Sequence, residues 1–207
     1  MKNLFHLLLV FGGLCPSLLL AQPYSYEKNF KHGLSLFQEG NYRSAIVEFS
    51  IAVEIEPRKE GFLYLAEAKQ KIQDWEGALR VYENLIGIDS TDAVVFNNQG
   101  NLFDLLQKPE AALRAYDRAL ALDPAYTEAK YNRAITYFNV QDYNRARRDF
   151  EKVLEANPED WEAMLGLALT EYRLGDTGRA CAYLIKAKEG GLALAQKYLE
   201  EYCETRN

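Results

Sequence analysis

Residues 93–126 have the sequence AVVFNNQGNLFDLLQKPEAALRAYDRALALDPAY. Four positions carry its pattern: Gly100, Ala112 twelve residues later, Tyr116 four residues after that, and Pro124. Small residues at the first two positions let two helix backbones approach closely, and the ring fills the space beside the crossing. The proline cannot extend a helix, so the segment predicts a helix, a turn, a second helix and a second turn.

The same pattern recurs along the chain. The anchor alanines are 33, 34, 34 and 34 residues apart, at Ala45, Ala78, Ala112, Ala146 and Ala180. A small residue lies twelve positions before each anchor, at Gly33, Ala66, Gly100, Ala134 and Ala168. A large apolar side chain lies four positions after it, at Phe49, Tyr82, Tyr116, Phe150 and Leu184. A fixed period in this range indicates stacked repeats, and the regular turn residues exclude a coiled coil.

This spacing resembles the tetratricopeptide repeat (TPR) family. The resemblance implies an all-α fold, a right-handed α-solenoid of five helix-turn-helix units followed by a C-terminal capping helix. The units are expected at 26–58, 59–92, 93–126, 127–160 and 161–191, with the capping helix and tail at 192–207. The first helices are expected at 26–38, 59–72, 93–106, 127–139 and 161–174. The second helices are expected at 42–55, 75–88, 109–122, 143–156 and 177–189. Lys69 and Glu171 occupy positions where the family usually has a bulky apolar residue.

The N-terminal segment has the order of a secretory signal peptide. Lys2 precedes an apolar run from Leu4 to Leu20, which ends at Ala21-Gln22. We therefore expect a signal peptide at 1–21, cleaved before a short linker at 22–25, and export to the periplasm or exterior of a Gram-negative bacterium. The alternative is a retained membrane anchor, because the run just reaches spanning length. No second apolar stretch is long enough to span a bilayer, so no integral membrane segment is expected in the mature chain.

The charge balance is acidic. The chain has 30 acidic and 24 basic residues and a formal net charge of −6. Nucleic-acid-binding domains usually present a basic face, so this class of partner is not expected.

Two cysteines remain after signal removal. Cys181 is expected on the last second helix and Cys203 on the capping helix, with Gly190-Gly191 between them. Antiparallel packing of these helices could bring the two thiols level, and an even count fits an oxidising compartment. Two outcomes are open at this point, a disulfide or two buried free thiols.

The sequence lacks the residues of a catalytic or metal site. His32 is the one histidine of the mature chain, and there is no CxxC, GxGxxG or P-loop motif. We expect no enzymatic activity, no cofactor and no metal ion.

The TPR resemblance places the first helix of each unit on a concave surface that receives a peptide or a partner helix. The predicted groove residues are Phe30, Leu34, Phe37, Asn97, Asn101, Tyr131, Asn132, Ile135, Phe138 and Tyr172. Glu67, Gln70, Lys71 and Asp104 make the middle of this surface polar, and its two ends are aromatic. In the end units, the alternative is that these rings pack against the N-terminal segment and the capping helix. Phe30 and Leu34 replace the lysine and asparagine of the basic clamp that some family members use.

These observations predict a non-enzymatic protein-protein interaction scaffold for an envelope assembly or secretion system. One alternative is an accessory or inhibitory subunit of an envelope enzyme. Another is a binder of cell-wall carbohydrate, because aromatic faces stack on sugars. Recovery of one stoichiometric protein partner favours the scaffold, whereas sedimentation with purified cell wall favours the carbohydrate binder.

Overall fold

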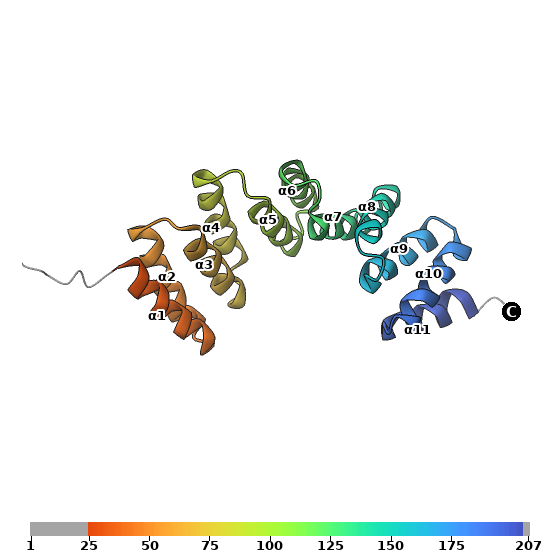
Figure 1. Cartoon of the computed structure of the whole chain (residues 1–207), viewed down its shortest axis with the longest axis horizontal. Helices are drawn as coiled ribbons and strands as arrows, with labels where there is room; N and C mark the ends of the chain where they lie inside the picture. The colour runs from red at the N-terminus through yellow and green to blue at the C-terminus, as the bar shows by residue number, and fades with distance from the viewer. Residues whose placement is uncertain (1–24, 205–207) are drawn as a thin grey trace, which may run out of the picture.

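The computed structural model describes residues 25–204, which form an elongated arch of helices (Figure 1). Ten helices form five consecutive pairs: α1 (Tyr26–Gln38) and α2 (Tyr42–Ile55), α3 (Lys59–Lys71) and α4 (Trp75–Ile88), α5 (Ala93–Leu105) and α6 (Pro109–Leu122), α7 (Thr127–Asn139) and α8 (Tyr143–Ala156), α9 (Trp161–Arg173) and α10 (Thr177–Glu189). A short helix, α11 (Ala193–Leu199), and a π-helical turn, η1 (Glu200–Glu204), follow. The described residues contain no strand. The predicted all-α solenoid with a C-terminal capping helix is confirmed.

The helix bounds follow the sequence pattern closely. All ten paired helices begin at the predicted residue, and α3, α5 and α9 each end one residue earlier than expected. The predicted signal peptide and cleavage site lie outside the described residues.

Small residues allow the two helices of a pair to touch. All five anchor alanines are fully buried. A Cβ atom added at Gly33 would lie 2.6 Å from Cε1 of Phe49, and one added at Gly100 would lie 2.4 Å from Cε1 of Tyr116. The rings therefore fill the space that the missing side chains leave, as the spacing predicts.

Each turn within a pair contains one residue in the left-handed conformation. Glycine fills this position at Gly40 and Gly175, as the turn sequences suggest, but glutamine fills it in the three middle units, at Gln73, Gln107 and Gln141. The residue that follows the left-handed residue donates its N–H to the carbonyl five residues earlier. The N–H of Lys108, for example, donates to the carbonyl of Phe103 at 2.8 Å. This bond satisfies an end carbonyl of the first helix and fixes the reversal of the chain.

The C-terminal segment closes the stack. Leu199 of α11 is buried against the last pair. The structure joins Cys181 on α10 to Cys203 in η1 by a disulfide, with the two Cα atoms 5.9 Å apart. The ring of Tyr202 stacks on that of Tyr172 of α9, with centroids 3.8 Å apart.

The two charged residues at usually apolar positions are accommodated by ion pairs. Glu171 is 1 % exposed, and its Oε1 lies 2.9 Å from Nη1 of Arg179 without hydrogen-bond geometry. Burial raises the pKa of Glu171, while Arg179 and Arg147 oppose that shift. Lys69 Nζ lies 3.0 Å from Oδ2 of Asp74, the residue that caps α4.

Candidate binding groove

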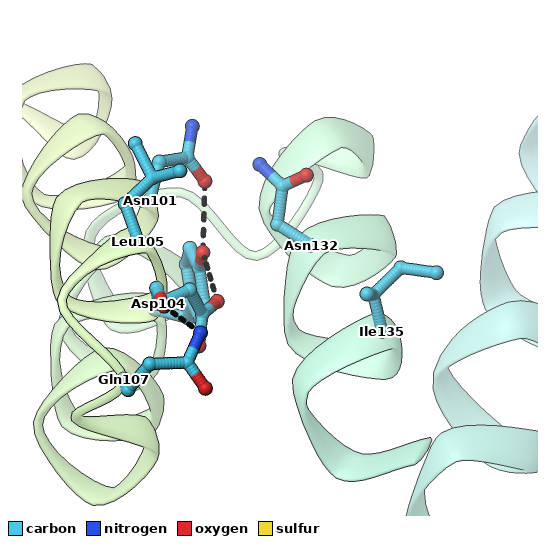
Figure 2. Close-up of a pocket in the computed structure, with 7 residues that line it drawn as sticks. Asn101, Asp104, Leu105, Gln107, Asn132 and Ile135 are labelled. Carbon is cyan, nitrogen blue, oxygen red and sulfur yellow. Dashed lines mark hydrogen bonds between the residues drawn. The ribbon is translucent and has the colours of Figure 1, made fainter. Parts of the chain in front are cut away.

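A central cavity of about 420 Å³ lies between α5 and α7, which lie on the inner side of the arch (Figure 1). Figure 2 shows Asn101, Asp104 and Leu105 of α5 opposite Asn132 of α7, and Ile135 further along α7 with its side chain directed away from α5. The same cavity is also lined by Gln107 and Tyr116. Asn101 and Asp104 are three residues apart, so an α-helix places them on one face.

A hydrogen-bond cluster forms the floor of the cavity. The hydroxyl oxygen of Tyr116 lies 2.8 Å from both Asn101 Oδ1 and Asp104 Oδ2. These two oxygens share the hydroxyl proton as acceptors. Thr136 Oγ1 of α7 donates to the same Asp104 oxygen at 2.6 Å. Burial raises the pKa of Asp104, although these two hydroxyls favour its charged form. Burial also raises the pKa of Tyr116 far above its usual value, and the Asp104 carboxylate adds to that shift.

A second polar cluster holds α5 to α7 beneath the surface. Asn97 is fully buried, and its Nδ2 donates to Glu128 Oε1 at 3.2 Å and to the Tyr126 hydroxyl oxygen at 3.3 Å. Asn132 Nδ2 donates to Asn97 Oδ1 at 3.0 Å. Burial and the Glu128 carboxylate raise the pKa of Tyr126 to about 12. Asn97 therefore connects two repeats and offers no group to a ligand.

A smaller cavity of about 260 Å³ extends the surface toward α3. It is lined by Leu63, Glu67, Gln70, Tyr82, Asn98 and Asn101. Asn101 lines both cavities, so the two are neighbours, and their linings come from three repeats. We call the two cavities together the central groove.

Models of one protein family match this chain. Three family models described as tetratricopeptide repeat match residues 60–89, 93–126 and 131–199. The chain belongs to the tetratricopeptide repeat family. In this family, small rotations between repeats create extended concave surfaces that serve for binding.

Solved structures of other TPR proteins share this fold. The crystal structure of MamA superposes with a TM-score of 0.73 at 21 % identity, covering 86 % of this chain and 95 % of MamA. YrrB, whose structure is titled "a TPR protein with an unusual peptide-binding site", gives 0.70 at 18 % identity, covering 83 % and 90 %. PilF of Pseudomonas aeruginosa gives 0.69 at 25 % identity, covering 80 % and 76 %. A search of curated protein sequences found no match.

The TPR solenoid uses several predicted groove residues in its own packing. Phe30 is 7 % exposed and lies against Phe49 and Tyr64, as in the alternative in which the rings of the end units pack inside the protein. Asn97 is fully buried, and its amide donates to Glu128 inside the protein. Phe37 is half-buried, with its ring against Tyr64.

The other predicted residues are half-buried. Leu34 packs against the first core cluster, and the rings of Tyr131 and Phe138 meet Phe150 and Tyr143 edge-on. Tyr172 lies beneath Tyr202. Of the predicted set, the structure brings Asn101, Asn132 and Ile135 together around the central cavity.

Leu105, Gln107 and Tyr116 line the central groove but were not predicted. Leu105 is 53 % exposed, and the signal in the sequence was its place directly after Asp104, which was predicted to lie on the inner face. The position of Tyr116 in the repeat predicts that its ring lies in the core. The spacing does not show that its hydroxyl reaches the groove.

Two kinds of site are absent from residues 25–204. No three His, Cys, Asp or Glu side chains there lie close enough to hold a metal ion. No helix in that range has the length and apolarity needed to cross a membrane.

Proposed function

We propose that this TPR protein is a non-enzymatic scaffold that binds a segment of a protein partner along the central groove. One observation carries the proposal: two neighbouring cavities share Asn101 in their linings, and the amides of Asn101 and Asn132 lie open in the middle of the arch. Within the described residues, Asn101 Nδ2 and Asn132 Oδ1 make no hydrogen bond. One is a donor and the other an acceptor, so together they match the carbonyl and N–H groups of an extended peptide.

Apolar contacts lie beside these amides. Leu105 is 53 % exposed, and Ile135 of α7 lines the same cavity. An exposed leucine in a concave surface gains free energy when a ligand covers it. The groove therefore offers backbone recognition and apolar contact to the same segment. The peptide-binding site named in the YrrB title supports this proposal, since YrrB has the same fold.

We also propose that the scaffold works outside the cytoplasm, for an envelope assembly or secretion system. The apolar N-terminal run that ends at Ala21-Gln22 supports export. The Cys181–Cys203 disulfide supports an oxidising compartment, since such bonds persist there and are rare in the cytosol.

Site-specific photo-cross-linking tests the groove. A p-benzoylphenylalanine at Leu105 should cross-link one protein partner in intact cells. The same probe at Val47 is the control, because Val47 is equally exposed, at 56 %, but lines neither cavity. Cross-links of equal yield and identity from both positions would show that the partner does not use the groove.

N-terminal sequencing tests the compartment. Protein recovered from the periplasmic fraction should begin near Gln22. Recovery of the chain in the cytosol with Met1 or Lys2 at its start would contradict export.

A further inference from the structure

We infer that the segment bound in the central groove is cationic, with one basic side chain seated at Asp104 and the next in an acidic pocket between α7 and α9. This inference rests on the proposed function and specifies its ligand. It is argued from the charges that the protein leaves unpaired.

The protein pairs its shielded carboxylates with basic side chains almost everywhere. Nine Asp and Glu residues in the range 25–203 are buried or half-buried. Seven of them lie within 4.0 Å of a basic side chain, in the pairs Glu48–His32, Asp74–Lys69, Asp92–Lys59, Asp142–Arg145, Asp149–Arg133, Glu151–Arg179 and Glu171–Arg179. The two that do not are Asp104 and Asp160. Hydrogen bonds partly compensate both carboxylates, from Tyr116 and Thr136 to Asp104 and from the N–H of Ala163 to Asp160, but no basic side chain balances their charge.

Asp104 is the first exception, and it lines the central cavity. Its Oδ2 accepts from Tyr116 and Thr136, while its Oδ1 makes no hydrogen bond in the part of the chain that the structure describes. The free oxygen of a half-buried carboxylate in a groove is a strong acceptor for an ammonium or guanidinium group.

Asp160 is the second exception, and it lines a separate cavity of about 220 Å³. The cavity is lined by Thr127, Glu128, Tyr131, Val153, Asp160 and Glu162, and we call it the acidic pocket. Neither Glu128 nor Glu162 has a basic side chain within 4.0 Å among the described residues. The ring of Tyr131 forms a wall of the pocket, and burial raises the pKa of Tyr131, with added contributions from Glu162 and Asp160. The lining therefore offers a basic side chain both carboxylates and an aromatic ring.

The acidic pocket adjoins the central groove. Glu128, Tyr131 and Ile135 lie three and four residues apart along α7, so they share one helix face. Glu128 and Tyr131 line the acidic pocket, and Ile135 lines the central cavity. The two seats differ in position both across and along the helices. Packed helices are about 8–10 Å apart, and Glu128 lies seven residues, or about 10 Å, before Ile135 along α7. An extended chain advances about 3.3 Å per residue, so the two basic side chains should be about four or more residues apart.

A bound peptide is a better match than an inorganic cation. The described residues contain no group of three potential ligands close enough to hold a metal ion. A lysine or arginine side chain does not need that geometry, since its stem packs on Tyr131 while its charged end reaches the carboxylates.

Selection from a display library of random dodecapeptides on the purified protein tests the inference. The selected pool should be enriched in Lys and Arg, with pairs about four or more residues apart. A synthetic dodecapeptide from that pool should bind about tenfold more weakly to Asp104→Asn, because a charge-assisted contact is lost. Asn keeps an acceptor for Tyr116 and Thr136, and circular dichroism melts check that the variant is folded.

A matched pair of capping residues controls for the fold. Asp160 and Asp142 each accept a backbone N–H at the start of a helix, but Asp142 lies outside both cavities and is paired with Arg145. Asn is an equally good cap, so neither change should disturb the helix start. Asp160→Asn should lower the affinity for the dodecapeptide about threefold to tenfold, whereas Asp142→Asn should leave that affinity unchanged.

The outcomes separate this inference from the proposed function. Selected peptides without basic residues, whose binding still falls in Asn101→Ala, would overturn the charge inference and leave the groove as the binding site. Peptides bound equally by all groove variants would overturn the proposed function as well. A selection without any enriched basic peptide also counts against the inference.

Discussion

A single methyl group at Gly100 should destabilise the protein, although alanine is the better helix former. In the Gly100→Ala variant the new Cβ would lie 2.4 Å from Cε1, 2.7 Å from Cδ1 and 2.8 Å from Cζ of Tyr116. Carbon atoms pack at about 3.5–4.0 Å, so the ring would have to retreat by about 1 Å. Tyr116 is 1 % exposed, and its hydroxyl is held by Asn101 and Asp104 at 2.8 Å, so little room exists for that retreat.

The opposing contributions can be compared. Overpacking a core costs about 1–3 kcal/mol, and a weakened hydrogen bond of Tyr116 adds about 1 kcal/mol. The higher helix propensity of alanine opposes these losses and stabilises the folded state by about 0.5–1 kcal/mol. The net free energy of unfolding should fall by about 1–3 kcal/mol, which lowers Tm by about 2–12 °C in a protein of this size.

Gly87→Ala is the matched control. Gly87 lies in α4, and a Cβ atom added there would meet nothing within 4 Å. This variant should keep the propensity gain of up to about 1 kcal/mol and lose nothing. Thermal and urea melts followed by far-UV circular dichroism measure both. If Gly100→Ala melts at or above the wild-type temperature, the Tyr116 ring does not lie as close to α5 as the structure indicates.

Three further changes test other parts of the solenoid. Gln141→Gly should stabilise the protein by about 1 kcal/mol, because Gln141 has a φ of 64°, where a side chain costs free energy; an unchanged or lower Tm would contradict this. Reducing the Cys181–Cys203 disulfide, which spans 22 residues, should cost about 3 kcal/mol, measured as a lower Tm with reductant present. Glu171→Leu should raise the free energy of unfolding near neutral pH by about 1 kcal/mol or more, measured as a higher Tm. The change removes a buried carboxylate that makes no hydrogen bond, while the arginine left behind, Arg179, is 42 % exposed and keeps its pair with Glu151. The pKa of Glu171 is raised in the folded state, so ionisation of the wild-type residue destabilises the fold as pH rises above the pKa of an unfolded glutamate. The stability gained by Glu171→Leu should therefore shrink as pH falls toward about 4, where Glu171 is protonated in both states.

The helices could be predicted from the sequence because their determinants are local. Small residues, rings and prolines at fixed spacing specify which faces meet, and these faces do meet in the structure. The left-handed glutamines could not be predicted, because glutamine has no preference for that conformation. The turn at Gln107 has the same length and the same backbone bond as the glycine turns, so the packing of the pair imposes the conformation on whatever residue is present.

The groove could be predicted only as a helix face. Register places Phe30 and Asn97 on the inner face, but the depth of each depends on side chains from the next repeat. Tyr64 covers Phe30, and Glu128 takes the amide of Asn97. These neighbours are more than thirty residues away in sequence, so no pattern within a repeat shows which inner-face residues remain open to a ligand.

Tyr116 belongs to two parts of the molecule at once, with its ring in the core against Gly100 and its hydroxyl in the floor of the groove. A ligand that engages the free oxygen of Asp104 therefore binds the same carboxylate whose other oxygen holds a core side chain, and by linkage such a ligand raises the melting temperature as it binds. Tyr116→Ala would remove the ring and the hydroxyl together, so a loss of binding could not be attributed to either one. Tyr116→Phe keeps the ring and removes the hydroxyl, so it is the substitution that separates recognition from folding at this position.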